Sequence, residues 1–550
     1  MTRGLLAAAA LLALLAARAV RGDAPPAASP EPRPRLVLVV VVDQLRRDHL
    51  DPALPGGLGR LAREGRVFVD ARIDHAHTET CPGHVTILTG VHPGRAGVPG
   101  NQFVDRDSGR VVYCVEDPEA RHREIGGDAF RSPGLVRMDG FGDWLRRAHP
   151  EARVFAVSAK DRAAILLGGR RPDAAYWIDR RRSAGFTTSG YYRRDLPGWV
   201  RAFNGHDRPE GGFLGRLPET WTHPGSAPGA RPDDFPGESP RHGAASPHPV
   251  ADADPLTAVS RLVASPFVDE VTLDFALELL RREGLGRDEV PDLLAVSLSA
   301  TDMVGHLYGP ESQEALDCLH RVDRALARFL EAVDREIGPG RTLVVLTSDH
   351  GVMPLPEWLE AIGASECPVP GGRVDARRLL LDLDRALHRE LDPPGAPDGR
   401  WLAVAGYRFT VNRRRAAALG VPVDRVVEAA RRWLEAVPVV QRVWTPEEIA
   451  ARSDREPLAR LYRNSFDPER GGDFEVQVLP TCLLSPFPFG TSHGTPWAYD
   501  REVPLVFHGS GVESGIVRGR ARPVDVAPTL AELLAIPVPP GLDGRPLPLR

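Results

Sequence analysis

The chain has 550 residues, of which 42% are hydrophobic and 26% charged, and its formal net charge is −5. This composition excludes a disordered tail, a collagen-like repeat and a small disulfide scaffold. The weakly negative charge argues against nucleic acid as a partner, because non-specific nucleic-acid binding needs a broad cationic surface. Lys160 is the only lysine among 69 basic residues, the others being arginine.

Residues 1–22 have the features of a secretory signal peptide. Arg3 precedes an apolar run at 5–17, and small residues follow it. The run is shorter than the ~20 residues that a membrane-spanning helix needs, which favours a cleaved signal over an uncleaved anchor. We therefore predict a periplasmic or secreted protein without a membrane span, in which residues 23–35 form a Pro-rich linker.

The chain contains five cysteines, enough in an exported protein for two disulfides and one remaining thiol. No C-x-x-C metal-binding motif is present. The spacing leaves the pairing open among Cys81, Cys114, Cys318, Cys367 and Cys482.

Five short apolar runs predict β-strands, and each is followed by polar residues. The runs are continuous rather than alternating, which is typical of parallel strands covered by helices on both faces. Apolar residues spaced by three and four from 311 to 337 predict a helix between two of the strands, and so a βαβ unit. We predict an α/β fold with a mostly parallel sheet, whose ligands gather at the carboxyl ends of the strands. The predicted strands are 36–42, 154–157, 293–298, 342–347 and 503–507.

Two segments interrupt this pattern. Residues 180–255 are rich in Gly, Pro, Arg and Asp, and predict a loop-rich insertion that packs over the sheet as a lid. Residues 375–480 have a βαβ-like pattern of their own, with a helix at 424–436, and predict a small inserted α+β subdomain. The catalytic domain would then comprise 36–374 and 481–550.

Six carboxylate and imidazole side chains lie in or just after strand-to-loop transitions. Such a mixture suits Zn²⁺ better than Ca²⁺, which prefers oxygen ligands alone. Six ligands are enough for two ions with three protein ligands each. Taken singly, each is more typical of a helix cap, a turn or a surface loop, and Gly351 is expected to turn the backbone after two of them. The six are Asp43, Asp302, His306, Asp349, His350 and His493.

A short helix is predicted to begin at Thr80. Pro82 suits an early helical position and Gly90 suits the end of the helix. The simpler interpretation is that Thr80 is an ordinary N-cap. The functional one is that the helix N-terminus directs backbone N–H groups at an anion, beside a threonine hydroxyl that a metal could activate as a nucleophile.

These residues belong to an ordered set of short motifs that resembles the alkaline phosphatase superfamily. The chain most resembles the phosphate-irrepressible alkaline phosphatases of flavobacteria and sphingomonads, which use a threonine nucleophile. The resemblance extends from about residue 36 to 547 and includes the closing segment 524–547. The motifs are Asp43-Gln44, Thr80-Cys81-Pro82-Gly83-His84, Gly100-Asn101, Lys160-Asp161-Arg162, Thr301-Asp302-Met303-Val304-Gly305-His306, Ser348-Asp349-His350-Gly351 and Ser492-His493-Gly494.

The resemblance implies an alkaline-phosphatase-like fold and two Zn²⁺ ions as cofactors. A bound divalent metal can activate a hydroxyl that is a poor nucleophile near neutral pH. The implied reaction transfers phosphate to Thr80 and then to water, through a phosphothreonine. The implied ligands are Asp43, Asp349, His350 and Thr80 for one ion, and Asp302, His306 and His493 for the other.

Three further residues bear on the substrate. A phosphate monoester has more charged oxygens than a diester, and Lys160 and Arg162, as alternate residues of an extended segment, would both point at them. Asn101 would donate a further hydrogen bond, and in the resembled family the Lys–Arg pair marks phosphomonoesterases. We therefore predict a monomeric alkaline phosphatase acting on small phosphate monoesters. The alternative is a phosphodiesterase or nucleotide pyrophosphatase with the same two-metal site.

Other hydrolase chemistries fit less well. A tyrosine-phosphatase nucleophile at Cys81 would need an arginine six residues later, where Ile87 stands. Residues 490–494 match the nucleophile-elbow pattern G-x-S-x-G, but two prolines in the preceding segment make it a poor central strand. A sulfatase would need Cys or Ser at the position of Thr80.

Overall fold

The computed structural model describes residues 33–206, 212–225 and 229–550. The predicted signal peptide, 1–22, and nearly all of the predicted linker lie outside these residues. Within the described ranges, each helix is too short or too polar to span a bilayer.

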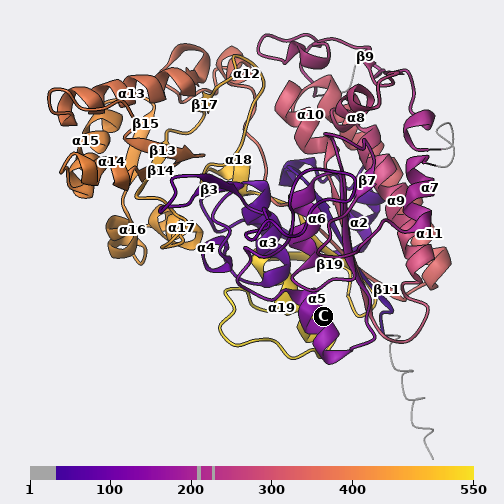
Figure 1. The fold of residues 1–550 in the computed structure, drawn as a ribbon. Helices are drawn as coiled ribbons and strands as arrows, with labels where there is room; N and C mark the ends of the chain where they lie inside the picture. Colours follow the sequence, from indigo (N-terminus) through magenta and orange to yellow (C-terminus); the bar gives the residue numbers. More distant parts are fainter. Residues whose placement is uncertain (1–32, 207–211, 226–228) are drawn as a thin grey trace, which may run out of the picture.

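A nine-stranded sheet forms the centre of the fold (Figure 1). Its five central strands are parallel neighbours, which confirms the predicted mostly parallel sheet, whereas several outer pairs are antiparallel. In spatial order the strands are β19 (Gly515–Ala521), β2 (Arg66–Ala71), β18 (Leu505–Gly509), β11 (Thr342–Thr347), β1 (Leu36–Val42), β10 (Asp292–Leu298), β5 (Val154–Ser158), β6 (Ala174–Ile178) and β7 (Phe186–Thr187).

The five predicted strands are confirmed as β1, β5, β10, β11 and β18. Four match to within one residue at each end. The last was predicted at 503–507 but begins at Leu505. Pro504 precedes it, and because proline has no N–H to donate to a ladder, the strand starts after it.

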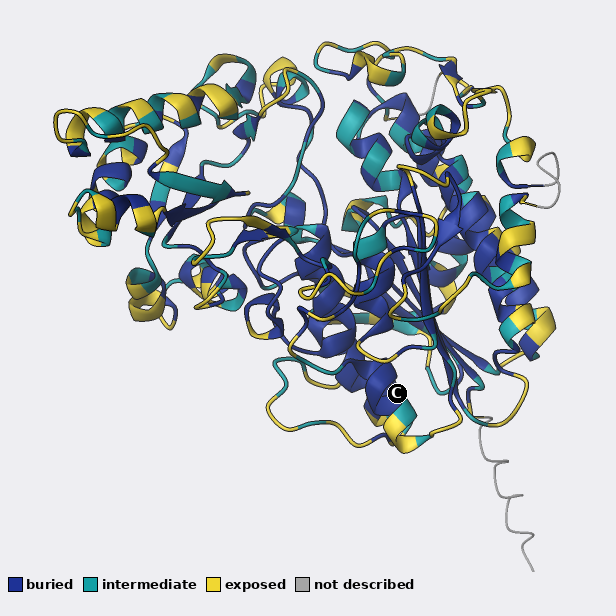
Figure 2. Ribbon diagram, viewed as in Figure 1, coloured by how far each residue is buried: buried dark blue, intermediate teal, exposed yellow. Residues whose placement is uncertain are grey.

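Helices cover both faces of this sheet, so every residue of β1 is buried (Figure 2). Alternate residues of β1 belong to two separate apolar cores, one on each face. Burial of each Val or Leu side chain contributes about 1.5–3 kcal/mol. One face is covered by α2 (Gly57–Glu64), α8 (Pro255–Val263), α9 (Phe267–Glu283), α10 (Ala300–Tyr308) and α11 (Gln313–Ile337), and the other by α3 (Thr80–Thr89), α5 (Phe141–Ala148), α6 (Asp161–Gly168) and α19 (Val526–Leu533).

The helix predicted at 311–337 is confirmed as α11. It begins two residues later than predicted because Ser312 caps it, accepting a hydrogen bond from the Ala315 N–H at 2.9 Å. It ends before Gly338, whose φ of 98° is unfavourable for other residues.

A second sheet of four strands lies within residues 375–480 and has an apolar core of its own. All neighbouring pairs are antiparallel, but the strands Arg408–Val411 and Val440–Trp444 both run antiparallel to the strand Phe474–Val478 and are therefore parallel to each other. Helices join these two strands in the chain, so the expected βαβ-like pattern is present with a third strand inserted between its two strands, and the helix predicted at 424–436 forms at Val423–Glu435. A tight turn at Gly406, with a φ of 61°, joins two of the strands directly. This part, drawn in orange in Figure 1, contains β13 (Leu402–Ala405), β14 (Arg408–Val411), β15 (Val440–Trp444), β16 (Phe474–Val478), α13 (Ala376–Leu391), α14 (Arg413–Ala418), α15 (Val423–Glu435), α16 (Pro446–Arg452) and α17 (Pro457–Ser465).

In its described residues, the segment 180–255 contains only short elements. Strand β7 extends the main sheet, and Phe186 in it stacks on Phe275 of α9 at 4.0 Å between ring centroids. Trp221 donates to Asp317 of α11 at 2.7 Å. The segment therefore extends the sheet at its β7 edge and packs on helices α9 and α11, which cover one face of the sheet. Its other elements are α7 (Gly198–Asn204), β8 (Thr220–Trp221) and β9 (His248–Pro249).

Two disulfides form, Cys81–Cys114 and Cys367–Cys482, and Cys318 is a buried free thiol. The first disulfide joins the start of α3 to the end of β4 (Val111–Tyr113), which pairs with β3 (Gln102–Val104). The second joins the segment after α12 (Pro356–Ala361) to the residue before β17 (Leu483–Ser485), which pairs with β12 (Arg373–Asp375).

Candidate active site

The carboxyl ends of three neighbouring parallel strands bring four of the predicted ligands together. Asp43 directly follows β1, and Asp302 lies in the first turn of α10, just after β10. Asp349 and His350 follow β11. All four are buried. The sheet thus places them at the edge where ligands gather in α/β proteins.

The second predicted ligand set is Asp302, His306 and His493. Asp302 Oδ1 lies 3.2 Å from His306 Nε2 and 3.5 Å from His493 Nε2, and the two Nε2 atoms are 3.2 Å apart. The Nδ1–H of His306 donates to the Thr491 carbonyl at 2.8 Å, and that of His493 to the Thr78 carbonyl at 2.6 Å. With Nδ1 protonated, each neutral ring presents an Nε2 lone pair to the centre of the set, as in metal-ligating histidines.

The first predicted ligand set has the same arrangement. His350 Nε2 lies 3.5 Å from Asp43 Oδ1 and 3.4 Å from Asp349 Oδ2. The Nδ1–H of His350 donates to the Gly351 carbonyl at 3.0 Å. Within the described part of the chain, these three facing atoms are buried without a hydrogen-bond partner, and Asp349 Oδ2 also lies 3.1 Å from His84 Nδ1, outside the set. Such atoms are costly unless a cation or proton satisfies them.

The distances within both sets fit a tetrahedral metal site. With bond lengths of about 2.0–2.2 Å, two ligand atoms of such a site lie about 3.4 Å apart. The three separations in the Asp302 set are 3.2, 3.2 and 3.5 Å, and His350 Nε2 lies 3.4 and 3.5 Å from the two carboxylates of the other set. Both groups of residues therefore fit a metal ion.

Electrostatics support the same conclusion. Burial raises the pKa of Asp43 well above its ordinary value, and repulsion from Asp302 and Asp349 adds to the effect. Burial also opposes ionisation of Asp302, but the Lys160 ammonium together with His306 and His493 outweighs it and holds the pKa of that carboxyl well below its ordinary value. Burial lowers the pKa of His350 to about 3, so this ring is neutral. Crowded buried carboxylates of this kind favour cation binding.

Lys160 lies between the two ligand sets. Its Nζ forms ion pairs with Asp43 of one set and Asp302 of the other, and the residue is only 5% exposed. Its backbone is extended, but Arg162 is in the first turn of α6, so the predicted extended segment is wrong from Asp161 onward. An acidic residue at the start of a helix is favoured by the helix dipole, which accounts for α6 beginning there.

Arg162 reaches the predicted nucleophile. Its Nη2 donates to Thr80 Oγ1 at 3.4 Å, and its Nη1 donates to Tyr113 Oη at 3.4 Å. Tyr113 Oη in turn donates to Asp161 Oδ1 at 2.6 Å, and Arg131 Nε pairs with Asp161 Oδ2 at 2.6 Å. This network holds the guanidinium in place. Sequence reasoning missed Tyr113, and the only signal near it was Cys114, whose disulfide holds β4 beside α3.

Helix α3 packs closely against the residues that follow the carboxyl ends of the strands. A Cβ at Gly83 would lie 2.3 Å from the Asp349 carbonyl oxygen, so only glycine lets the helix bring Thr80 this near. Gly351 has a similar role, because a Cβ there would lie 2.2 Å from the Tyr499 carbonyl oxygen. Its φ is not positive, so close approach and not the expected turn explains this glycine.

Asn101 is held at the start of α3. Its Oδ1 accepts a hydrogen bond from the Cys81 N–H at 2.8 Å, and its own N–H donates to Glu79 Oε2 at 2.8 Å. The NH₂ group of Asn101 is therefore the part of the side chain that can donate to a bound anion. Arg408, on β14 of the smaller sheet, lies 3.5 Å from Glu79, so that sheet supports the site as well.

Gln44 is a second residue whose role the sequence did not indicate. It has a positive φ of 67°, uncommon for a residue other than glycine. In this conformation its Nε2 donates to Asp302 Oδ1 at 2.8 Å, and its N–H donates to Asp349 Oδ1 at 3.2 Å. Gln44 thus orients one carboxylate of each ligand set. The only sign of this role in the sequence was that Gln44 belongs to the Asp43-Gln44 motif of the resemblance.

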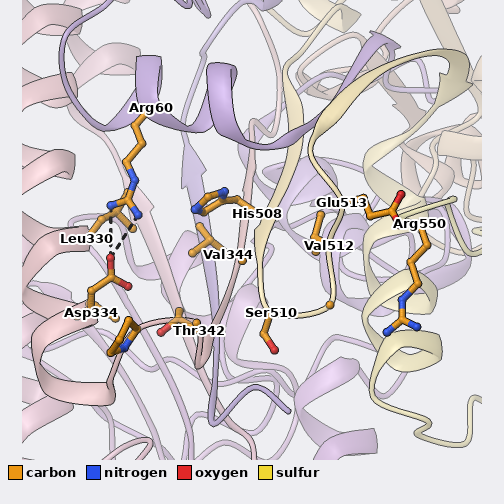
Figure 3. A pocket seen from close by; sticks show the side chains of 15 residues that line it. Arg60, Leu330, Asp334, Thr342, Val344, His508, Ser510, Val512, Glu513 and Arg550 are labelled. Carbon is orange, nitrogen blue, oxygen red and sulfur yellow. Dashed lines mark hydrogen bonds and ion pairs between the residues drawn. The ribbon is translucent and has the colours of Figure 1, made fainter. Parts of the chain in front are cut away.

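Two cavities help to locate the site. One of about 490 Å³ lies by Thr342 and His508, at the start of β11 and so at the opposite end of that strand from Asp349 (Figure 3). Another of about 390 Å³ is lined by His306, His493 and apolar residues of the smaller sheet and its helices. Only the second adjoins the predicted ligands, and it leaves room for the organic part of a substrate.

Comparison with known proteins identifies the class. The family model described as type I phosphodiesterase / nucleotide pyrophosphatase matches residues 37–453. The chain belongs to this family. This confirms the predicted superfamily, and the enzyme is a phosphatase of that superfamily.

Two relatives have a more specific name than the family, alkaline phosphatase. The chain is 32% identical to alkaline phosphatase PhoK of Sphingomonas sp. over 94% of this chain and 91% of that protein. It is 29% identical to alkaline phosphatase PafA of Elizabethkingia meningoseptica, over 94% of both chains.

Solved structures confirm the predicted fold class. The crystal structure of wild-type PafA matches with a TM-score of 0.84 and 29% identity, over 94% of this chain and 99% of that one. Murine ectonucleotide pyrophosphatase / phosphodiesterase 5, at 14% identity and a TM-score of 0.52, shares the fold.

Proposed function

We propose that the protein is an alkaline phosphatase that hydrolyses small phosphate monoesters through a phosphothreonine at Thr80. The observation that carries this proposal is the contact of Thr80 Oγ1 with Arg162 Nη2, at 3.4 Å, together with the two ligand sets at the ends of the strands. The names of the relatives PhoK and PafA, both alkaline phosphatases, support it. The same residues support a monomeric enzyme, since one chain supplies all of them.

We assign two Zn²⁺ ions to the site, one for each ligand set. Zn²⁺ bound there would lower the pKa of the Thr80 alcohol and neutralise charge on the phosphate oxygens. The supporting observations are the mixed imidazole and carboxylate donors and their separations of 3.2 to 3.5 Å.

The residues of the chain then perform a two-step displacement. Thr80 Oγ1 loses its proton and attacks phosphorus in line with the leaving alcohol oxygen. The bond from phosphorus to that oxygen breaks, the alcohol leaves with a proton, and Thr80 becomes a phosphothreonine. Arg162 and the NH₂ group of Asn101 donate hydrogen bonds to the phosphate oxygens, where charge is concentrated in the transition state. Water then attacks the phosphothreonine on the opposite side, which releases phosphate and restores Thr80.

The charge of the site favours monoesters. A monoester dianion has three non-bridging oxygens, whereas a diester has two and carries a second organic group. Lys160 and Arg162 supply two positive charges close to Thr80, and a dianion gains more from them than a monoanion does. The family model, described by its phosphodiesterases and nucleotide pyrophosphatases, is the observation that favours the second candidate, a diesterase with the same ligand sets.

We also propose that the enzyme is exported to the periplasm or secreted, with residues 1–22 as the signal peptide. Two disulfides support this, because they persist in oxidising compartments. The separate sheet and core within 375–480 support that segment as an inserted subdomain, and 36–374 with 481–550 as the catalytic domain. Residues 180–255 would form its loop-rich insertion.

A comparison of two substrates tests the proposed function. The purified, zinc-loaded protein is assayed with an aryl phosphate monoester and with the diester of the same phenol. We expect a much higher kcat/KM for the monoester. A kcat/KM for the diester that equals or exceeds it would overturn the proposal in favour of the diesterase.

A further inference from the structure

A third group of metal-ligand residues lies outside the catalytic site, where the segment 180–255 meets α11. His223 follows β8, His248 begins β9 and Glu314 lies in the first turn of α11. Their ligand atoms all lie within 4.8 Å of one another. The side chains are 2%, 3% and 0% exposed, so the group is closed to solvent.

The hydrogen bonds of this group satisfy only some of its polar atoms, and the remaining atoms face one another. His248 Nδ1 lies 3.4 Å from the His242 carbonyl oxygen; with the proton on Nδ1, the neutral ring presents its Nε2 lone pair to Glu314 Oε1, 3.1 Å away. Two lone pairs at this distance repel unless a proton or a metal ion lies between them. In the described residues, His223 Nε2 and Glu314 Oε2 are also buried without a hydrogen-bond partner.

We propose that His223, His248 and Glu314 bind a structural Zn²⁺ ion, with Asp233 as the fourth ligand. The distances from Glu314 Oε1 to His248 Nε2 and His223 Nε2 are 3.1 and 3.5 Å, and His223 Nε2 lies 3.7 Å from Asp233 Oδ2. These distances are close to the separation of about 3.4 Å expected between two ligand atoms of a tetrahedral Zn²⁺ site. Four protein ligands leave no open position, which is the arrangement of a structural site, whereas a catalytic zinc site keeps one position for water or substrate.

Such an ion would connect the segment to the helix that carries a catalytic ligand. Tyr308 is the last residue of α10, two positions after His306. Its Oη donates to the Gly243 carbonyl at 2.9 Å and lies 3.3 Å from His248 Nδ1. The ion would therefore stabilise the end of α10 and, with it, the position of His306.

Zinc would compete here with a proton. The Gly225 N–H donates to His223 Nδ1 at 3.2 Å, so the neutral ring carries its proton on Nε2. Binding of Zn²⁺ at Nε2 moves that proton to Nδ1 and opens the contact with Gly225, which is exposed. The alternative occupant is a proton shared between His223 or His248 and Glu314.

The test measures zinc per chain in the purified full-length protein. Three variants are compared with wild type after the same zinc loading and dialysis: His223→Ala, Glu314→Gln and the control His320→Ala, an exposed histidine on α11. We expect the first two to hold one zinc fewer than wild type, and the control to hold the same amount. Because the ion would also help to position His306, phosphatase activity is measured on the same samples, and a variant that has lost one zinc but keeps activity has lost it outside the catalytic site.

Equal zinc in wild type and in folded Glu314→Gln would overturn the proposal and leave a proton-bridged cluster. Glu314→Gln preserves the shape of the side chain, and circular dichroism checks that each variant is folded. If neither variant folds, anomalous diffraction at the zinc edge from wild-type crystals decides. A peak between His248 and Glu314 is expected, and its absence would overturn the proposal equally.

Discussion

Arg162 Nη2 donates to Thr80 Oγ1 across 3.4 Å, although the two residues are 82 positions apart in the chain. Each lies in the first turn of a helix, α6 and α3, on the same face of the main sheet. A phosphate bonded to Thr80 would therefore place an oxygen next to the guanidinium. The predictions below follow from this arrangement and from the charges around it.

Replacing Thr80 by alanine should abolish turnover. The hydroxyl is the group that forms the covalent intermediate, and loss of a nucleophile typically costs at least ~10³-fold in kcat. Binding of inorganic phosphate, measured by calorimetry, should change little because Arg162 and Asn101 remain. A Thr80→Ala variant with substantial residual kcat would refute the nucleophile assignment.

Tyr113→Phe should lower the kcat/KM for monoesters by about 5- to 10-fold. It removes the hydroxyl that contacts both Arg162 and Asp161, and one such hydrogen bond is worth about 1–1.5 kcal/mol. The matched control is Tyr191→Phe, whose hydroxyl donates to the Arg170 carbonyl away from the ligand sets. Equal activity of Tyr113→Phe and the control would show that Tyr113 does not position Arg162.

Lys160→Ala should impair monoester hydrolysis by at least ~10²-fold, and diester hydrolysis far less, because buried charge contacts of this kind are worth several kcal/mol. Lys160→Arg should not restore the rate, since a planar guanidinium cannot take the place of an ammonium between Asp43 and Asp302. Zinc content, measured in parallel, shows whether the ligand sets stay intact. Equal losses on both substrates would contradict the proposed role of Lys160.

Chelation should remove all activity, and Zn²⁺ should restore it. The ligand sets contain three histidines whose Nδ1–H groups are all bonded to backbone carbonyls, which leaves three Nε2 atoms as borderline-soft donors. The assay is reactivation of the chelated enzyme by each divalent metal in turn. Rescue by Ca²⁺ or Mg²⁺ but not by Zn²⁺ would show that the metal assignment is wrong.

Stability should fall in acid partly because of His75. Burial lowers the pKa of this histidine to about 3, with repulsion from His92 adding to the effect. A depressed folded-state pKa contributes stability above the unfolded value of about 6.5, and this contribution is lost as the pH falls from there towards 3. Between pH 6.5 and 5, one such group lowers the free energy of unfolding by about 2 kcal/mol.

Denaturant unfolding at pH 7.5 and pH 5 measures this effect. His75→Gln, which stays neutral, should lose less stability between the two pH values than wild type. The control His320→Gln replaces an exposed histidine and should behave as wild type. Identical pH dependence in wild type and His75→Gln would contradict the assignment.

Much of the fold could be predicted from local sequence patterns. The run at 36–42 predicted β1 to the residue, because a strand buried on both faces needs an unbroken apolar run. Asp43, Asp349 and His350 could be identified because polar residues directly after such strands lie at the edge where ligands bind. The boundary errors were small and came from local chemistry, as at Pro504 and Ser312.

The sequence by itself thus determined the strands, the main helices and the residue types of the site, because these depend on patterns only a few residues long. The tertiary structure alone decided what depends on approach between distant segments. It pairs Cys81 with Cys114, places His493 against His306, and sets Lys160 between two carboxylates. Each of these contacts depends on how helices and loops pack on the sheet, and no spacing along the chain encodes that distance.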